Sequence, residues 1–191
     1  MLPADQSSWF DFADRLAEQG YRVLTFNFRG YCPGGDAGCS KGTKDPNSAW
    51  QDVADARSFL LSQGPTRLAL VGASIGGTAS LVSASRDPEG IEGVATLSAP
   101  VSIDGLVAGP EVMAAVGASK LFLAGDEDPN GAEASAQALY DESVQPKQLE
   151  VLTTADHGTD LLGGNQGEHA RTLLQGWLTR YLPVSAGSTA P

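Results

Sequence analysis

The sequence predicts an α/β fold in which a mostly parallel sheet carries helices on both of its faces. Stretches with helical and with strand-like apolar spacing alternate along nearly the whole chain. Strands that are separated by helices have to run parallel, because a parallel crossover needs a dozen or more residues. One strand candidate, residues 68–71, is a short continuous apolar run, which is typical of a strand buried on both faces. In such sheets, functional residues gather at the carboxyl ends of the strands.

The first half of the chain holds two predicted helices, one predicted strand and one long loop. Apolar residues recur at helical spacing over residues 5–20, and residues 21–28 have the composition of a strand. Residues 29–47 form a loop dense in glycine, proline, aspartate and lysine. Ser48 is a candidate cap for the next helix, which should end near Gly64. The positions of this helix expected to face inward are Val53, Ala56, Phe59 and Leu60.

The second half repeats the alternation of strands and helices. Strands are predicted over residues 68–71, 91–97, 120–124 and 148–152. Helices are predicted over residues 75–85, 132–141 and 168–181, with one helical turn near residues 111–116. A chain of 191 residues suits one domain, over residues 1–182, followed by a disordered tail over residues 183–191.

Composition restricts the class of partner and the location. The formal net charge is −11 and the isoelectric point is near 4.4, so the surface repels phosphate backbones and anionic lipid headgroups. We therefore expect neither nucleic acid nor a membrane as partner. The sequence shows no apolar run long enough to span a membrane and no signal peptide after Met1. These features favour the cytoplasm, with secretion open if a segment is missing at the N-terminus.

Both cysteines of the chain, Cys32 and Cys39, lie in the glycine-rich loop. They form a small disulfide in an oxidising compartment or remain two free thiols in a reducing one. A zinc site is not expected, because His157 and His169 are the only further soft ligands.

Ser74 is the candidate nucleophile. It is the centre of Gly72-Ala73-Ser74-Ile75-Gly76, which matches G-x-S-x-G, follows a predicted strand and opens a predicted helix. Small residues let such a turn close, and the helix N-terminus places the Ile75 N–H where an oxyanion would develop. The alternatives are a glycine-rich turn with an idle serine and a phosphate-binding turn, although the lysine of a P-loop is missing.

His157 is the candidate general base for this serine, because histidine is the usual base near neutral pH. It follows the last predicted strand at the functional edge of the sheet, whereas His169 begins the final helix and is expected at the surface. The acid that orients the base should be a carboxylate at another strand end. Three candidates follow one predicted strand: Asp126, Glu127 and Asp128.

Three motifs together resemble the α/β-hydrolase superfamily, especially its small serine-esterase and dienelactone-hydrolase-like branches. They are Gly-x-Ser-x-Gly-Gly at residues 72–77, Leu-Ala-Gly-x-x-Asp-Pro at residues 123–129 and His-Gly-Thr-Asp at residues 157–160. The chain order of serine, aspartate and histidine is also the order of that fold. The resemblance implies Asp128 as the acid, with Asp126 as second choice. Dienelactone hydrolases proper use a cysteine nucleophile, so Ser74 points away from lactone hydrolysis of that kind.

The resemblance also implies strands that this chain lacks, so the fold is expected to be N-terminally truncated. In the family, one missing strand lies between the strands that match residues 21–28 and 68–71, and its loss leaves a gap inside the sheet. The loop after that strand normally supplies the second oxyanion-hole N–H. Leu2 is the candidate for this donor, and Met1 is a weaker one.

The connection over residues 98–119 is short, so we expect no large cap domain and an open site. Three apolar residues of this connection belong to the core or line an acyl pocket, and we favour the core. They are Leu106, Val107 and Met113.

These features predict a serine hydrolase that cleaves short or accessible carboxylic esters, thioesters included, through an acyl-enzyme. The expected triad is Ser74, His157 and Asp128, and the expected oxyanion-hole residues are Ile75 and Leu2. The partner is a small-molecule ester, and the chemistry requires no metal or organic cofactor. One alternative is a catalytically weak or inactive binding protein with the same fold. Another is a cofactor-free lyase or perhydrolase that uses the same triad.

Overall fold

The structure, a computed structural model, describes residues 5–32 and 39–184. Four parallel strands form its main sheet, in the order β1-β2-β5-β6. All four lie where the sequence predicts strands, and their parallel pairing brings their carboxyl ends to one edge. Their bounds are β1 (Leu68–Ala73), β2 (Ile91–Leu97), β5 (Ser119–Gly125) and β6 (Lys147–Leu152).

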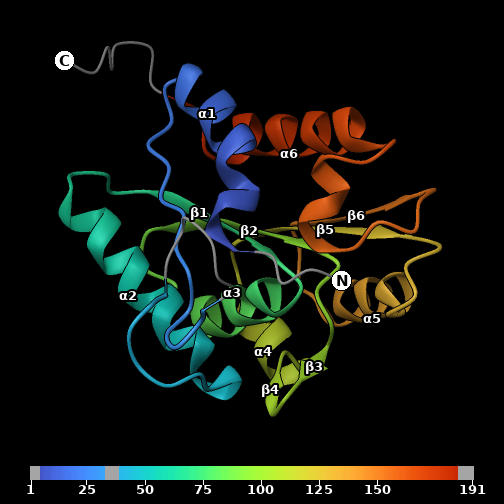
Figure 1. Cartoon of the computed structure of the whole chain (residues 1–191), viewed down its shortest axis with the longest axis horizontal. Helices are drawn as coiled ribbons and strands as arrows, with labels where there is room; N and C mark the ends of the chain where they lie inside the picture. The colour runs from blue at the N-terminus through green and yellow to red at the C-terminus, as the bar shows by residue number, and fades with distance from the viewer. Residues whose placement is uncertain (1–4, 33–38, 185–191) are drawn as a thin grey trace.

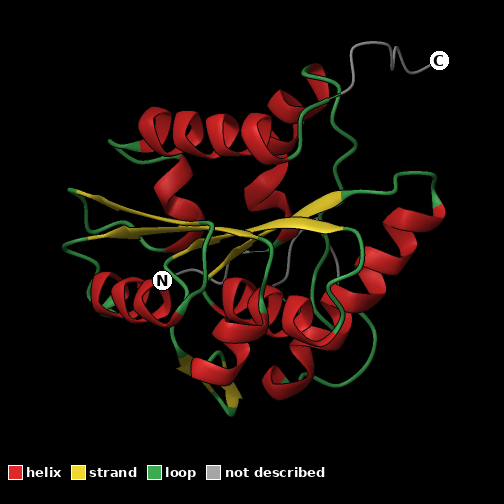
Figure 2. Cartoon of the chain, turned by 180° about the vertical axis from the view of Figure 1, so that it is seen from behind, coloured by secondary structure: helices red, strands yellow, loops and turns green. Residues whose placement is uncertain are grey.

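Helices cover both faces of the sheet, as the sequence predicts (Figure 2). One face carries α1 (Phe10–Glu18) and α6 (Gly167–Tyr181) (Figure 1). The opposite face carries α2 (Ala49–Ser62), α3 (Ile75–Arg86), α4 (Pro110–Ala115) and α5 (Ala132–Glu142). The part of the chain that the structure describes also contains three short 3-10 helices: η1 (Gln6–Trp9), η2 (Pro46–Ser48) and η3 (Gly158–Leu162). In the described part of the chain, no helix is long and apolar enough to cross a membrane.

Two apolar clusters fill the space between the sheet and its two helical layers, and β5 contributes to both. Leu121 and Leu123 belong to the cluster with α1 and α6, whereas Phe122 and Ala124 belong to the cluster with α2, α3 and α5. All four are 0% exposed. Successive side chains of a strand point to opposite faces, so a strand that is covered on both sides needs a continuous apolar run. Each buried leucine or phenylalanine side chain stabilises the fold by about 1.5–3 kcal/mol.

Residues 21–28 form no strand, although the sequence predicts one. A strand needs a neighbour for its ladder hydrogen bonds, and the space between this segment and β1 is a cavity of about 1020 Å³. Residues 21–29 line the cavity together with β1. Among the described residues, β1 therefore pairs with β2 alone. The gap expected inside the sheet lies between β1 and residues 21–28.

The connection between β2 and β5 is described throughout and contains a small hairpin and α4, without a cap domain. α4 lies close to the predicted helical turn. The hairpin, formed by β3 (Ser102–Ile103) and β4 (Leu106–Val107), was not predicted, because strands of two residues carry no detectable period. Leu106 and Met113 are buried in the core as favoured, whereas Val107 is 49% exposed.

The beginning and the inner face of α2 differ from the prediction. Ser48 does not cap the helix, because its hydroxyl donates to Asp45 instead. Asp45 caps the preceding turn η2 by accepting from the Asn47 N–H at 3.1 Å. Phe59, which was expected to face inward, is 57% exposed. The buried stripe of α2 is therefore narrower than its apolar spacing suggests.

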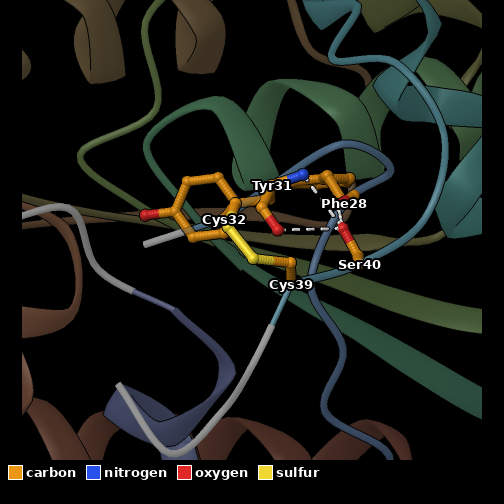
Figure 3. Close-up of a disulfide and its surroundings, with 5 residues drawn as sticks. All are labelled: Phe28, Tyr31, Cys32, Cys39 and Ser40. Atoms are coloured by element: carbon orange, nitrogen blue, oxygen red, sulfur yellow. Dashed lines mark hydrogen bonds between the residues drawn. A yellow bond between two sulfur atoms is a disulfide. The ribbon is translucent and has the colours of Figure 1, made fainter. Parts of the chain in front are cut away.

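A disulfide joins Cys32 and Cys39, which is one of the two alternatives that the sequence left open (Figure 3). Beside it, the Ser40 hydroxyl accepts from the Tyr31 N–H at 2.9 Å and donates to the Phe28 carbonyl. These bonds bring the two ends of the loop together. Several predicted features lie wholly or partly outside the described residues: residues 33–38 of the predicted loop, the donors Met1 and Leu2, and residues 185–191 of the tail predicted over residues 183–191.

Candidate active site

Ser74 lies in the turn between β1 and α3, at the carboxyl edge of the sheet. Its backbone has φ 50° and ψ −124°, a conformation that costs a non-glycine residue about 1–3 kcal/mol. The turn is held on both sides, because the Ser74 N–H donates to the Leu97 carbonyl at 2.8 Å and the Ser74 carbonyl accepts from the Gly77 N–H at 2.9 Å. The motif therefore has the strand–turn–helix context that a nucleophile elbow requires.

Close packing explains two of the glycines around Ser74. A Cβ added to Gly72 would lie 2.3 Å from the Gly76 carbonyl oxygen, and one added to Gly77 would lie 2.7 Å from the Ala99 Cβ. Gly76 is different, because an added Cβ would meet only the Phe28 ring, at 3.9 Å. It is the backbone of Gly76 that approaches Gly72, so the space for a side chain is restricted at Gly72 and not at Gly76.

Asp128 and His157 follow neighbouring strands and meet at the edge where Ser74 lies. Asp128 comes after β5, and His157 comes after β6 and immediately before η3. The His157 Nδ1 lies 2.6 Å from the Asp128 Oδ2. Their side chains are 12% and 0% exposed, respectively. The structure thus brings together the histidine that the sequence indicated and the aspartate that the resemblance implied.

Asn130 holds the other oxygen of Asp128 with two donors. Its backbone N–H and its side-chain amide each donate to the Asp128 Oδ1 at 2.9 Å. Burial raises the pKa of Asp128, but the Asn130 N–H, the His157 ring and the Asn130 amide outweigh it, so the pKa lies below its usual value. The carboxyl is therefore an anion at neutral pH. Asn130 was not predicted from the sequence, because an asparagine two residues after an aspartate in a proline-containing turn indicates the turn and not a contact with the carboxylate.

Asp126, the second choice for the acid, forms a hydrogen bond with the loop that leads to His157. Its Oδ1 accepts from the Thr154 N–H at 3.1 Å. The Thr154 hydroxyl in turn donates to the Asp156 Oδ2 at 2.8 Å. Glu127, the remaining carboxylate of this stretch, is exposed. Of the three candidates, Asp128 is the one that contacts the imidazole.

Ser74 and His157 line the same two cavities. The larger is the cavity of about 1020 Å³ beside β1, and the smaller has a volume of about 140 Å³. Ser98 and Asn130 also line the smaller one. Both Ser74 and His157 are described, and no hydrogen bond joins the hydroxyl to the ring. Catalytic hydrogen bonds are often long or poorly aligned before a substrate binds, so the shared cavities are the relevant observation.

The Ile75 N–H begins α3 directly after Ser74. The first N–H groups of a helix have no acceptor within the helix, and the helix dipole favours negative charge at that end. Leu2, the expected second donor, lies outside the described residues. His169 lies on α6, is exposed and lines neither cavity, as expected for a surface residue.

The described residues offer no cluster of three or more His, Cys, Asp or Glu side chains that could hold a metal ion. Cys32 and Cys39 are joined to each other. The His157 Nδ1 is directed at Asp128. The polar side chains that line the smaller cavity or contact His157 are serine hydroxyls, the Asn130 amide and the Asp128 carboxylate.

A protein-family model described as the alpha/beta hydrolase fold matches residues 2–157 of the chain. A comparison with curated proteins finds no match. The chain resembles several solved structures in fold. The esterase domain of a Rhodothermus marinus protein is 22% identical with a TM-score of 0.72, over 94% of this chain and 82% of that one.

Two further structures extend this similarity. A monoacylglycerol lipase from Paleococcus ferrophilus is 15% identical with a TM-score of 0.76, over 95% of this chain and 92% of that one. A dienelactone hydrolase from Anabaena variabilis is 22% identical with a TM-score of 0.60, over 72% of this chain and 62% of that one. At such identities the likeness shows the fold alone.

Proposed function

The chain belongs to the α/β-hydrolase fold family, and on this premise we propose that it is a serine hydrolase that cleaves carboxylic esters. Ser74 is the proposed nucleophile, His157 the general base and Asp128 the acid that orients it. One observation carries the proposal: His157 Nδ1 lies 2.6 Å from the buried Asp128 carboxylate, and the imidazole lines the same cavities as Ser74. Structures of the same fold that are named as an esterase domain and a lipase support it.

The proposed reaction passes through an acyl-enzyme. His157 Nε2 takes the proton of the Ser74 hydroxyl as the oxygen attacks the ester carbonyl. The Asp128 carboxylate accepts from Nδ1–H, fixes the tautomer and stabilises the imidazolium that forms. The Ile75 N–H binds the oxyanion at the positive end of α3. The imidazolium then protonates the leaving alkoxide, and a water molecule repeats the sequence to release the acid.

We infer that the substrates are esters or thioesters with a short or accessible acyl group. The connection between β2 and β5 carries only a hairpin and α4, so it forms no large lid over Ser74. The smaller cavity at Ser74, of about 140 Å³, has room for about five water-sized groups. That volume suits an acetyl or butyryl group.

The direct test is hydrolysis of p-nitrophenyl acetate, butyrate and octanoate by the wild type and by Ser74→Ala. We expect turnover by the wild type, with a preference for the two shorter esters, and a loss of about 10⁴-fold or more in Ser74→Ala. Ser58→Ala is the matched control, because Ser58 is an exposed serine on α2 whose hydroxyl donates to the Ala54 carbonyl. Equal rates in the wild type and Ser74→Ala would contradict the proposal.

A catalytically weak or inactive binding protein is the second candidate, and the large cavity beside β1 favours it. A volume of about 1020 Å³ matches the upper end of small-molecule sites, which reach about 1,000 Å³. A fluorophosphonate probe separates the two candidates, because only an activated serine reacts with it. An adduct on Ser74, located by mass spectrometry, supports the hydrolase. The absence of both adduct and turnover supports the binding protein.

A further inference from the structure

The Asp128 carboxylate is held at both of its oxygens, and one of the two partners lies outside the proposed triad. Oδ2 faces the His157 Nδ1 at 2.6 Å, and Oδ1 accepts two bonds of 2.9 Å from Asn130. The carboxylate side chain is 0% exposed, so protein groups supply its hydrogen bonds. Leaving a buried charged group without a hydrogen bond is costly.

Asn130 is exposed, and the turn after β5 places it next to Asp128. The Gly131 N–H donates to the Asp128 carbonyl at 3.0 Å, and Gly131 takes a φ of 69°, so the chain reverses within one turn. Asn130 also lines the smaller cavity together with Ser74 and His157. Because Asn130 is exposed, burial of its side chain in the core does not explain its position. Its amide instead binds the buried Asp128 carboxylate beside the candidate site.

We propose that the side-chain amide of Asn130 is a positioning group, which locks the Asp128 carboxylate in the rotation that directs Oδ2 at His157. The inference rests on the proposed serine-hydrolase function and deepens it. Rotation of the carboxylate would remove Oδ2 from the ring and Oδ1 from both Asn130 donors at once. The backbone N–H survives any substitution except proline, so the inference concerns the amide alone.

The competing explanation is that Asn130 only shapes the turn. Asparagine is frequent in turns because its side chain bonds to nearby groups of the same loop. In that case, a substitution that keeps the backbone N–H changes the free energy of unfolding slightly and leaves the reaction unaffected.

Two substitutions distinguish these explanations. Asn130→Ala removes the amide and keeps the N–H, and we expect kcat for p-nitrophenyl acetate to fall about tenfold with KM unchanged. Asn130→Asp keeps the shape but places a second carboxylate against Oδ1. Like charges raise the pKa of one of the two carboxyl groups, so we expect the acid side of the kcat/KM profile to move to higher pH. Gln137→Ala is the matched control, because it removes an exposed amide on α5 that donates to Asp141 at 2.8 Å.

The outcomes separate this inference from the proposed function. Unchanged kcat and pH profiles in both variants would overturn it, whether or not Tm falls. A wild type that neither hydrolyses esters nor reacts with the fluorophosphonate probe would overturn the proposed function instead. If the wild type shows no turnover, the positioning role is tested by the proton NMR signal of the His157 Nδ1–H, which does not depend on activity. A signal that broadens or shifts in Asn130→Ala but not in Gln137→Ala supports the role, and an identical signal in all three proteins overturns it.

Discussion

At the scale of single residues, the proposed chemistry depends on how the charge of Asp128 is maintained. Burial opposes ionisation of its carboxyl, yet the donors on Asn130 and His157 keep its pKa below the usual value. An anion at this position can stabilise an imidazolium on His157 and select the tautomer with the proton on Nδ1. A neutral amide of the same shape can do neither.

We therefore expect Asp128→Asn to lower kcat for p-nitrophenyl acetate by about 10³–10⁴-fold while the fold is retained. Asp126→Asn is the matched control. Asp126 uses one oxygen to accept from the Thr154 N–H, and an asparagine oxygen can accept the same bond. Steady-state kinetics and circular dichroism of both variants check the prediction. A larger loss in Asp126→Asn than in Asp128→Asn would mean that the acid is misassigned.

The residues of the candidate site differ in how far the sequence could reveal them. Ser74 could be selected because, of the two G-x-S-x-G matches at residues 38–42 and 72–76, only the second lies between a predicted strand and a predicted helix. His157 could be selected because the chain has only two histidines. The choice between Asp126 and Asp128 needed the resemblance, since both follow the same strand. Asn130 could not be found, because its amide reaches Asp128 only after the turn at Gly131 has formed.

At the scale of elements, the elbow between β1 and α3 depends on the absence of a side chain at Gly72. We expect Gly72→Ala to destabilise the protein by about 1–3 kcal/mol, since the added Cβ would overlap the Gly76 backbone. Gly176→Ala is the control, because a Cβ in that part of α6 meets nothing within 4 Å. It should stabilise by about 0.5–1 kcal/mol through helix propensity. Urea unfolding measures both changes, and equal effects would contradict the close approach at the elbow.

Elements that are buried on both faces were the most predictable. β5 combines the continuous apolar run of residues 121–124 with burial along its whole length, so its sequence alone indicates a central strand. β2 is nearly as buried, although Glu92, Gly93 and Thr96 interrupt its apolar residues. Residues 21–28 have a similar composition but form no strand, because strand formation depends on a neighbour elsewhere in the chain. The prediction that Phe59 faces inward was wrong for a related reason. Helical spacing indicates which face of a helix is apolar, whereas contacts with the sheet decide how wide the buried part of that face is.

At the scale of the whole molecule, the main sheet formed by the described residues ends at β1. β1 has the apolar sequence of a central strand, yet its middle is only half-buried, whereas β5 is buried along its whole length. The difference arises because a cavity of about 1020 Å³ replaces a neighbour on the outer edge of β1. The same cavity reaches Ser74, so the edge of the sheet and the proposed site share one space.

This arrangement predicts a difference in hydrogen exchange between β1 and β5. Alternate N–H groups of a parallel strand point to opposite neighbours. Among residues 5–32 and 39–184, no strand accepts the N–H groups on the outer edge of β1, which face the cavity. We expect these amides to exchange much faster than those of β5, which pairs with β2 and β6 on its two sides. Hydrogen exchange resolved by NMR or by mass spectrometry of peptides measures both strands in one sample, with β5 as the internal control. Slow exchange along all of β1 would mean that its outer edge is paired in solution. The first segment to test as its partner would then be residues 21–28, which also line the cavity.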